Sequence, residues 1–415
     1  MTFEASRRNA GVRFGLRPIL SLLAISLLSF AVAGCASLPR TPYGAADAAA
    51  ARVLDLADLR RYADEPASTF RKDRAPFVVS LRGPRTYLAL SGGGADGAYG
   101  AGVLNGWTEA GTRPSFTIVS GVSTGALIAP FAFLGSDYDA TLREIYTSGV
   151  AESLLESPSP FNAIFGSGLF GNTKLRELVG RYIDAKFVAS VAAEYAKGRL
   201  LLIVTTDLDS QRTAIWDMGR IASLGNAEGI NLFRDVMAAS AGVPVVFSPM
   251  LVTAEANGRR FQEMHVDGGV TAPVLTLPEA FLLRNAKVGK AGDLQLYILI
   301  NNKVEREFQL VPNSTIEIAA RTSSTVTKTQ TRSILYSTHA FAQRNKFGFN
   351  LTYIESDRPA SPAAGFDTTY MRALFQYGHD RARSNNLWSK SPPSDNLDAR
   401  PALPTPYSRQ VNSGN

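Results

Sequence analysis

The chain has 415 residues, a formal net charge of +7, one cysteine and three histidines. A single cysteine excludes an intramolecular disulfide and a zinc or iron–sulfur site built on several thiolates, and three histidines argue against a multi-histidine metal centre. Hydrophobic residues at 45% and charged residues at 19% indicate a folded protein rather than a disordered one.

Residues 1–34 have the organisation of a secretory signal peptide. Four arginines precede an apolar stretch at 18–34, which ends in small residues before Cys35. The sequence Val-Ala-Gly-Cys at 32–35 resembles a bacterial lipobox, in which the cysteine becomes the lipidated first residue of the mature chain. Two or more buried acyl chains anchor a protein stably, whereas a single chain is marginal. A plain signal peptide and an uncleaved anchor helix are the alternatives.

The resemblance to a lipobox implies a lipid-anchored protein of the bacterial cell envelope. Alanine rather than aspartate follows Cys35, which by the same resemblance implies sorting to the outer membrane, facing the periplasm. Removal of residues 1–34 also removes a net charge of +3 and leaves +4 on the remaining chain. This weak charge, without a basic stripe interleaved with aromatic residues, argues against nucleic-acid binding.

The rest of the chain is expected to contain one large folded domain. Residues 35–80 are rich in alanine, proline, arginine and aspartate and are predicted to be a tether, in which 45–63 could form a short helix. The domain is expected over 81–390, and the proline-rich residues 391–415 are predicted to be a flexible tail.

Apolar runs that alternate with helical patterns predict an α/β domain. Strands are expected at 86–90, 116–119, 200–205, 294–300 and 348–354, with 212–217 pairing beside the third of them. One helix is expected after the first strand and its glycines, ending at about 110. Further helices are expected at 123–133, 142–156, 173–184, 230–241, 314–343 and 368–384. This alternation implies a mainly parallel sheet that is covered by helices on both faces.

A glycine-rich loop, Ser-Gly-Gly-Gly-Ala-Asp-Gly at 91–97, directly follows the first strand. It contains the pattern G-x-G-x-x-G, but a dinucleotide site also needs an acidic residue at the end of the next strand, and 116–121 ends without one. A plain structural turn is a second alternative. The third is an oxyanion loop, because bare glycines expose backbone N–H groups and the following helix adds the positive end of its dipole.

A second glycine motif, Gly-Val-Ser-Thr-Gly at 121–125, lies at the next strand-to-helix junction. G-x-S-x-G is the pattern of a nucleophile elbow, a strained turn that exposes the serine hydroxyl above the sheet. The pattern also occurs by chance in ordinary strand-to-helix turns, but here the strand before it and the helix after it supply the required context. Ser123 is therefore the candidate nucleophile.

A serine nucleophile needs a base. His339 and His379 lie in predicted helices, and nothing in the sequence singles them out. Asp267 precedes two glycines, so its carboxylate has little bulk around it, and a carboxylate beside a serine hydroxyl can act as general base. His265 would share the strand face of Asp267 and stays open as a neighbour or an alternative base. A plain Asp-Gly turn is the remaining interpretation.

The ordered motifs at 91–97, 121–125 and 267–269 together resemble the patatin-like phospholipases. The resemblance covers about 86–285 with motifs and extends to about 385, through an Ala-Ser-rich helix with a Pro/Phe segment and a closing helix. It implies a three-layer α/β/α fold with a mainly parallel central sheet, and a Ser–Asp dyad that needs no histidine.

By this resemblance Ser123 is the nucleophile and Asp267 is the base. The glycines take supporting roles: Gly92, Gly93 and Gly94 as oxyanion donors, Gly97 as the end of their loop, Gly121 and Gly125 as flanks of the elbow, and Gly268 and Gly269 as part of the Asp-Gly-Gly motif. The family often has Asp at the position of Ser91 and Arg or Lys at that of Asp96. This departure removes a side-chain cation near a lipid phosphate but leaves backbone donors untouched.

The expected activity is hydrolysis of lipid acyl esters, as a phospholipase, lipase or esterase, through an acyl-enzyme and without metal or cofactor. The expected partner is a membrane lipid substrate, and no oligomeric state is predicted. The competing interpretation is a non-catalytic envelope lipoprotein that uses the hydrolase fold as a binding or assembly module. Residues 161–170 are apolar but broken by glycine, so they are either a lid or membrane-contact loop or an ordinary buried connection.

Overall fold

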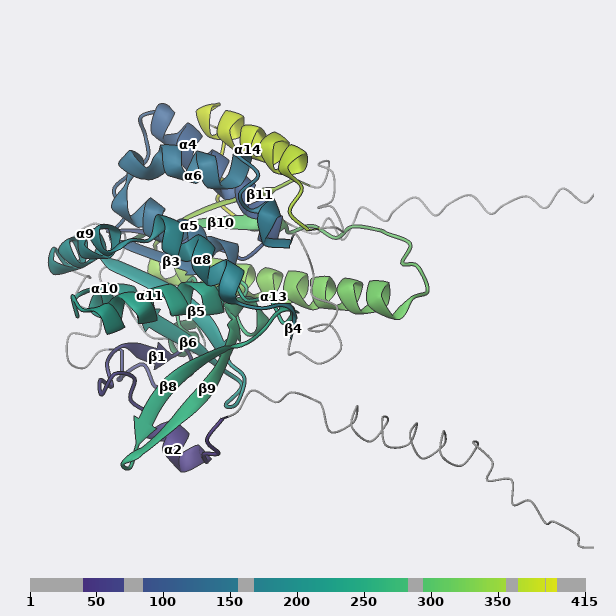
Figure 1. Cartoon of the computed structure of the whole chain (residues 1–415). Coiled ribbons are helices and arrows are strands. Elements are labelled where there is room, and N and C mark those ends of the chain that lie inside the picture. Colours follow the sequence, from purple (N-terminus) through teal and green to yellow (C-terminus); the bar gives the residue numbers. More distant parts are fainter. Residues whose placement is uncertain are drawn as a thin grey trace, which may run out of the picture.

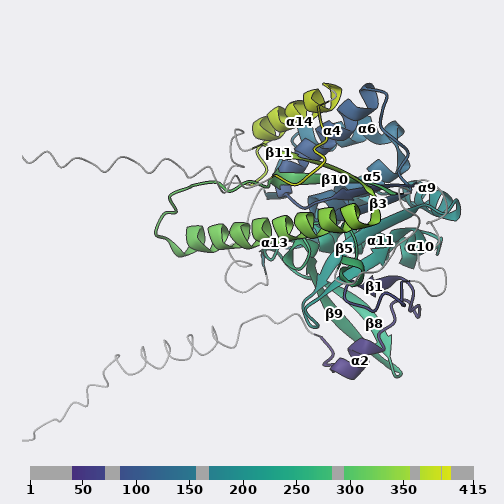
Figure 2. The same cartoon turned by 180° about the vertical axis from the view of Figure 1, so that it is seen from behind.

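A computed structural model of the chain describes residues 40–70, 85–155, 168–282, 294–355, 365–384 and 386–393. These residues form three layers, with a central sheet between two helical layers (Figures 1 and 2). The predicted α/β architecture with a mostly parallel sheet is confirmed. The predicted signal peptide, the lipidation site Cys35 and most of the segments 161–170 and 391–415 lie outside the described residues.

The centre of the main sheet is parallel. Its strands lie side by side in the order β5 (Leu200–Asp207), β3 (Ile118–Val122), β2 (Arg85–Leu90), β10 (Leu294–Lys303) and β11 (Gly348–Ile354). Every residue of β3 and β5 is buried. Helices therefore cover both faces of these strands, which explains why they read as continuous apolar runs in the sequence.

Antiparallel strands extend the sheet beyond β5. The strand β6 (Arg212–Asp217) pairs with β5 as predicted, and β1 (Arg60–Tyr62) pairs with β6 at the edge. The strands β8 (Met250–Ala256) and β9 (Arg259–Asp267) form a hairpin, and the end of β9 pairs with the end of β5. This last pairing brings Asp267 to the carboxyl edge of the parallel strands. The short strands β4 (Gly168–Phe170) and β7 (Val245–Phe247) pair apart from the main sheet.

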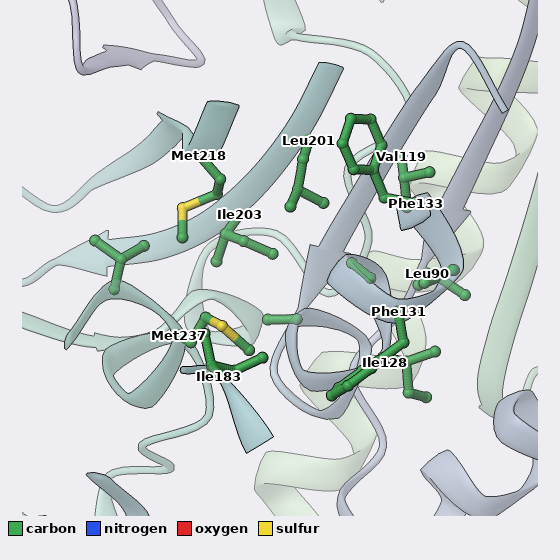
Figure 3. Close-up of a cluster of buried hydrophobic side chains, with 14 of the residues drawn as sticks. Leu90, Val119, Ile128, Phe131, Phe133, Ile183, Leu201, Ile203, Met218 and Met237 are labelled. Carbon is green, nitrogen blue, oxygen red and sulfur yellow. The ribbon is translucent and has the colours of Figure 1, made fainter. Parts of the chain in front are cut away.

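Most described helices cover one face of the sheet. They are α4 (Gly97–Glu109), α5 (Thr124–Leu134), α9 (Ala185–Ala196), α10 (Met218–Ala222) and α11 (Ala227–Ser240), with α6 (Asp139–Thr147), α8 (Thr173–Tyr182) and α14 (Thr368–Arg383) packed against them. Figure 3 shows Leu90, Val119 and Leu201 of the sheet facing Ile128 and Phe131 of α5. Burial of each such side chain contributes about 1.5–3 kcal/mol, so this layer holds the elbow helix α5 firmly in place.

The opposite face is covered by α13 (Thr315–Asn345) and the short α12 (Glu279–Leu282). Leu335 and Phe341, in the second half of α13, pack with Leu296 and Ile298 of β10. The first half of α13 and the connection that leads to it project beyond the body of the molecule (Figures 1 and 2). The two halves of one helix therefore have very different surroundings.

The predicted tether is not a tether over 40–70. Here α2 (Ala45–Ala49) replaces the expected helix at 45–63, and β1 joins the main sheet. Leu59 and Phe70 are fully buried. The alanine-rich and charged composition of this segment predicted that it would not pack against the domain. Arg60, however, forms a buried ion pair with Glu263 of β9. Long-range pairing of this kind leaves no local signal in the sequence.

Two further element boundaries differ from expectation. The strand predicted at 116–119 begins at Ile118 and runs on through Val122, directly into the serine turn. The helix predicted at 142–156 ends at Thr147, because Gly149 takes a left-handed conformation with φ of +94°, and a 3₁₀ turn follows at Glu152–Leu155.

Candidate active site

Ser123 occupies a strained turn between β3 and α5. Its backbone has φ of +55° and ψ of −125°, a conformation that residues with a Cβ rarely adopt. A Cβ on Gly121 would lie 2.3 Å from the Gly125 carbonyl oxygen, and one on Gly125 would lie 2.6 Å from the Leu90 carbonyl oxygen. Both flanking glycines are therefore required by close backbone contacts, and the turn has the geometry expected of a nucleophile elbow.

Ser240, at the end of α11, holds this turn from behind. The Ser123 N–H donates to Ser240 Oγ at 3.1 Å, and Ser240 Oγ donates to the Val204 carbonyl oxygen at 2.6 Å. The hydroxyl is fully buried. The sequence did not single out Ser240; its only signal was the Ala-Ser-rich character of the helix that contains it.

Asp267 lies at the end of β9, opposite Thr205 of β5. Its Oδ1 accepts the Gly269 N–H at 2.7 Å, while its Oδ2 is buried and accepts no hydrogen bond of regular geometry from the described residues. The Ser123 hydroxyl nevertheless lies close enough to favour the ionised carboxylate. Loose contacts of this kind are common in substrate-free sites and tighten when substrate binds.

Burial controls the acidity of Asp267. Removal of water raises the pKa of the carboxyl to about 6, and the hydrogen-bond interactions with Ser123 and the Gly269 N–H oppose this rise only in part. A carboxylate with a pKa near neutrality is ionised at pH 7 and still basic enough to accept a proton. The environment therefore suits a general base.

The glycines after Asp267 allow this placement. A Cβ on Gly268 would lie 2.4 Å from the Val204 carbonyl oxygen, so only glycine lets the end of β9 approach β5 so closely. Gly269 then supplies the N–H that orients the carboxylate.

The glycine loop packs directly against the elbow. A Cβ on Gly92 would lie 3.0 Å from Ser123 Cβ, and one on Gly97 would lie 2.2 Å from Thr124 Oγ1. Ser91 fixes the start of the loop to β10, since its Oγ accepts the Asn301 N–H at 2.8 Å and its carbonyl oxygen accepts from Asn301 Nδ2 at 2.9 Å. The structure thus brings the two glycine motifs together.

The predicted oxyanion role of Gly92 is wrong for its N–H group, which donates to the Pro273 carbonyl oxygen at 3.0 Å. The Gly97 N–H also has acceptors, because it donates to the carbonyl oxygens of Gly94 and Ala95 in the 3₁₀ turn that precedes α4. The N–H groups of Gly93 and Gly94 donate to no acceptor in the part of the chain that the structure describes. Gly94 has φ of +57°. Two of the predicted donors therefore remain free.

None of the described histidine contacts involves Ser123. His265 is fully buried, with Nδ1 2.9 Å from Thr205 Oγ1 and Nε2 3.4 Å from Glu263 Oε2. His339 packs against a phenylalanine ring, and His379 Nε2 lies 3.0 Å from Glu109 Oε1. Among the described residues, the carboxyl of Asp267 lies beside the Ser123 hydroxyl.

Within the described ranges, no three or more His, Cys, Asp or Glu side chains gather in a way that could hold a metal ion. A search of the same ranges for membrane spans finds no helix with the length and apolar character to cross a bilayer.

The family model described as patatin-like phospholipase matches residues 88–278, a range that includes the glycine loop, the elbow and Asp267. VipD from Legionella pneumophila is a similar solved structure, with 12% sequence identity, a TM-score of 0.35 and coverage of 73% of this chain and 66% of its own. The type III effector protein ExoU has 15% identity, a TM-score of 0.21 and coverage of 73% and 53%. This chain thus spans less than two thirds of the length of either structure. No curated protein matches it.

Proposed function

We propose that the protein is a serine hydrolase that cleaves acyl esters of lipids, because residues 88–278 match the family model of the patatin-like phospholipases. The observation that carries the proposal is the placement of Ser123, on a strained elbow, beside the buried carboxyl of Asp267. A lipid acyl hydrolase is the activity that the family match supports. The Ser123–Asp267 dyad and the choice of lipid acyl esters as substrates are the finer parts of the proposal.

The proposed reaction proceeds in two steps. Asp267 accepts the hydroxyl proton as Ser123 Oγ attacks the ester carbonyl carbon, and the carbonyl oxygen becomes an oxyanion bound by the N–H groups of Gly93 and Gly94. Asp267 then returns the proton to the leaving alcohol, and an acyl-enzyme remains. Asp267 then takes a proton from water, whose oxygen attacks the acyl carbon. The bond between Ser123 Oγ and the acyl carbon breaks, the fatty acid leaves, and Asp267 returns the proton to Ser123 Oγ. Loss of one oxyanion donor in other hydrolases slows the reaction by about 10²–10³-fold, so two donors supply a large part of the catalysis.

We also propose that Cys35 carries the lipid anchor of a bacterial envelope protein that faces the periplasm, as the lipobox-like sequence at 32–35 suggests. A palmitate analogue supplied to the growing cells should then label the parent protein and should not label a Cys35→Ser variant, because the acyl chains attach at this cysteine. Equal labelling of the two proteins would contradict the anchor.

The dyad is tested by Ser123→Ala and Asp267→Asn. We expect each change to lower kcat for a soluble short-chain ester by about 10⁴-fold or more, as does loss of one member of a catalytic triad. Ser384→Ala, at an exposed serine, is the matched control and should leave kcat unchanged. Circular dichroism and the thermal midpoint should show that all three variants fold. Full activity in either dyad variant would contradict the mechanism.

A fluorophosphonate probe separates the hydrolase from a non-catalytic lipoprotein with the same fold. The probe should label the unaltered protein at Ser123 and should not label the Ser123→Ala variant, because only an activated serine reacts. An unlabelled parent protein that is correctly folded would favour the binding or assembly module.

A further inference from the structure

We propose that the arm, defined as residues 304–326, is the surface through which the protein contacts the lipid bilayer and takes up its substrate. The arm consists of the connection after β10 and the first half of α13, and it projects from the body in both views (Figures 1 and 2). This inference rests on the proposed lipid hydrolase function and names the route by which substrate reaches that site.

Large apolar side chains on the arm are exposed to an unusual degree. Phe308 is 98% exposed and Leu310 is 85% exposed, while Ile318 and Val326 on α13 are about half exposed. Full burial of one such side chain stabilises a protein by about 1.5–3 kcal/mol. In water the arm lacks this stabilisation for each of its exposed apolar side chains. Clustered exposed apolar side chains mark an interaction surface, whereas isolated ones do not.

The helical part of the arm lacks the packing that normally stabilises a helix. From Thr315 to Val326 nearly every described side chain is exposed, in contrast to the buried Leu335 and Phe341 farther along the same helix. The arm also contains the run Thr-Ser-Ser-Thr at 322–325, whose residue types have modest helix propensity. Tertiary packing supplies most helical stability in proteins. We therefore infer that the first half of α13 is stabilised by contact with a surface outside the chain.

The chemistry of the arm suits a phospholipid surface. Its tip, residues 308–316, contains no charged residue, whereas the rest of the arm contains two basic and three acidic residues. Three further basic residues, Lys303, Lys328 and Arg332, lie just beyond its ends. Apolar side chains enter the boundary between head groups and acyl chains, while nearby lysines and arginines stay at the level of the phosphates. An uncharged tip between flanks that carry charges of both signs, with arginines and lysines among them, is compatible with this layering.

A cleft connects the arm with the catalytic loop. It has a volume of about 470 Å³, and Phe308, Val311 and Pro312 line it on the arm while Gly93 and Asp96 line it on the glycine loop. Gly93 is one of the two proposed oxyanion donors. An acyl ester that leaves the bilayer at the tip can therefore follow this cleft to the glycine loop, which packs against Ser123.

The size of the exposed apolar surface favours a membrane over a second copy of the chain. A stable protein–protein interface buries about 800 Å² on each partner. An exposed phenylalanine buries at most about 250 Å², and the narrow tip adds one leucine of comparable size. Phe308 and Leu310, even together with the half-exposed Ile318 and Val326, offer less apolar area than each partner of a stable dimer buries, whereas apolar side chains at a narrow tip can insert into a bilayer.

Membrane contact is tested with an environment-sensitive fluorophore. The protein is purified as the cell makes it and labelled at the thiol introduced by Phe308→Cys; the number of labels per chain shows whether Cys35 also reacts. We expect vesicles of phosphatidylethanolamine and phosphatidylglycerol, 3:1, to shift the emission to the blue and increase it at least twofold. Leu54→Cys is the matched control: Leu54 is 37% exposed, lies between α2 and β1 and should show no shift.

The functional test separates uptake from chemistry. The double variant Phe308→Ser/Leu310→Ser should hydrolyse phospholipid in these vesicles at least tenfold more slowly. The single variant Leu310→Ser, whose side chain does not line the cleft, should also slow vesicle hydrolysis and should hydrolyse a soluble short-chain ester at the parental rate. Unchanged vesicle hydrolysis, unchanged fluorescence, or a change in oligomeric state in the absence of lipid would each overturn the inference. A parent protein that hydrolyses neither ester would refute the proposed function, while the fluorescence would still decide whether the arm enters the bilayer.

Discussion

At the scale of single residues, the candidate site concentrates features that are unfavourable for folding. Ser123 holds a backbone conformation with positive φ. The Asp267 carboxyl is buried, and the two groups that oppose the rise of its pKa, the Ser123 hydroxyl and the Gly269 N–H, carry no charge. Strain and desolvation of this kind persist only where the surrounding structure enforces them, and they cluster at functional sites. Both side chains therefore carry a cost in stability that a purely structural turn would avoid.

The pH dependence of hydrolysis should report the titration of Asp267. Burial raises the pKa of this carboxyl to about 6, and only its ionised form can accept the serine proton. We expect kcat/KM for a soluble ester to rise about tenfold per pH unit well below pH 6 and to reach a plateau above about pH 7. Rates measured from pH 4.5 to 8 check this, and a plateau that extends down to pH 5 would contradict the assignment.

The same titration affects stability with a defined sign. The pKa of Asp267 is higher in the folded chain than the ordinary value of about 3.9 in an unfolded one, so the folded state binds the proton more tightly. Its contribution to stability is therefore fully present below pH 4 and is lost as the pH rises through about 6.

At the scale of elements, the site forms where several strands end at one edge of the sheet. The glycine loop follows β2, the elbow follows β3, and the arm follows β10, all at the carboxyl ends of parallel strands. Ligands of open α/β sheets bind outside this edge because the connecting loops converge there. The helix α11 then approaches from one face and supplies Ser240 to the elbow.

Removal of the Ser240 hydroxyl should weaken the elbow. In a Ser240→Ala variant the buried Ser123 N–H loses its acceptor, and a buried unpaired donor costs about 1–3 kcal/mol. We expect this loss in the free energy of unfolding by urea, together with a lower kcat at similar KM. Ser223→Ala is the matched control, because that exposed hydroxyl also donates to a helix carbonyl oxygen and should cost little. Equal stability in the two variants would show that Ser240 does not hold the turn.

At the scale of the whole molecule, the segment before residues 88–278, the range that the family model matches, belongs to the fold. Arg60 of β1 forms a buried two-pronged ion pair with Glu263 of β9, and its guanidinium lies 5.2 Å from the ring centre of Trp216. Glu263 also contacts His265, two residues before Asp267. The N-terminal segment is thus tied to the strand that carries the candidate base.

Glu263→Ala should destabilise the protein by about 3–5 kcal/mol, because it leaves the buried Arg60 charge without its partner. Burial alone would raise the pKa of Glu263, but hydrogen bonds from His265 and Arg60 lower it to about 2. Its stabilisation is therefore present above about pH 4.5 and lost as the pH falls towards 2. Urea unfolding at pH 7 and pH 4 measures both effects.

The matched control for this prediction is Glu255→Ala. Glu255 pairs with Arg260 in the same hairpin, but Arg260 is 72% exposed, so solvent screens the pair and its loss should cost about 1 kcal/mol or less. A similar cost for both variants would mean that the buried pair contributes no more than an exposed one.

The sequence by itself determined the alternation of strands and helices, the elbow around Ser123 and the motif around Asp267, because each depends on residues that are near neighbours in the chain. Apolar periodicity and closely spaced glycines are local signals. The sequence did not reveal that the Gly92 N–H is already bonded to Pro273. This bond depends on where a distant loop comes to lie.

Only the tertiary structure decided which residues support the site. Ser240 lies 117 positions from Ser123, and Arg60 lies 203 positions from Glu263, so neither pairing leaves a pattern within any local window. The projecting arm likewise looked like an ordinary long helix, since periodicity does not show that most described side chains in the first half of α13 are exposed. Long-range contacts are set by how whole layers fit together, and that fit exists only in the folded chain.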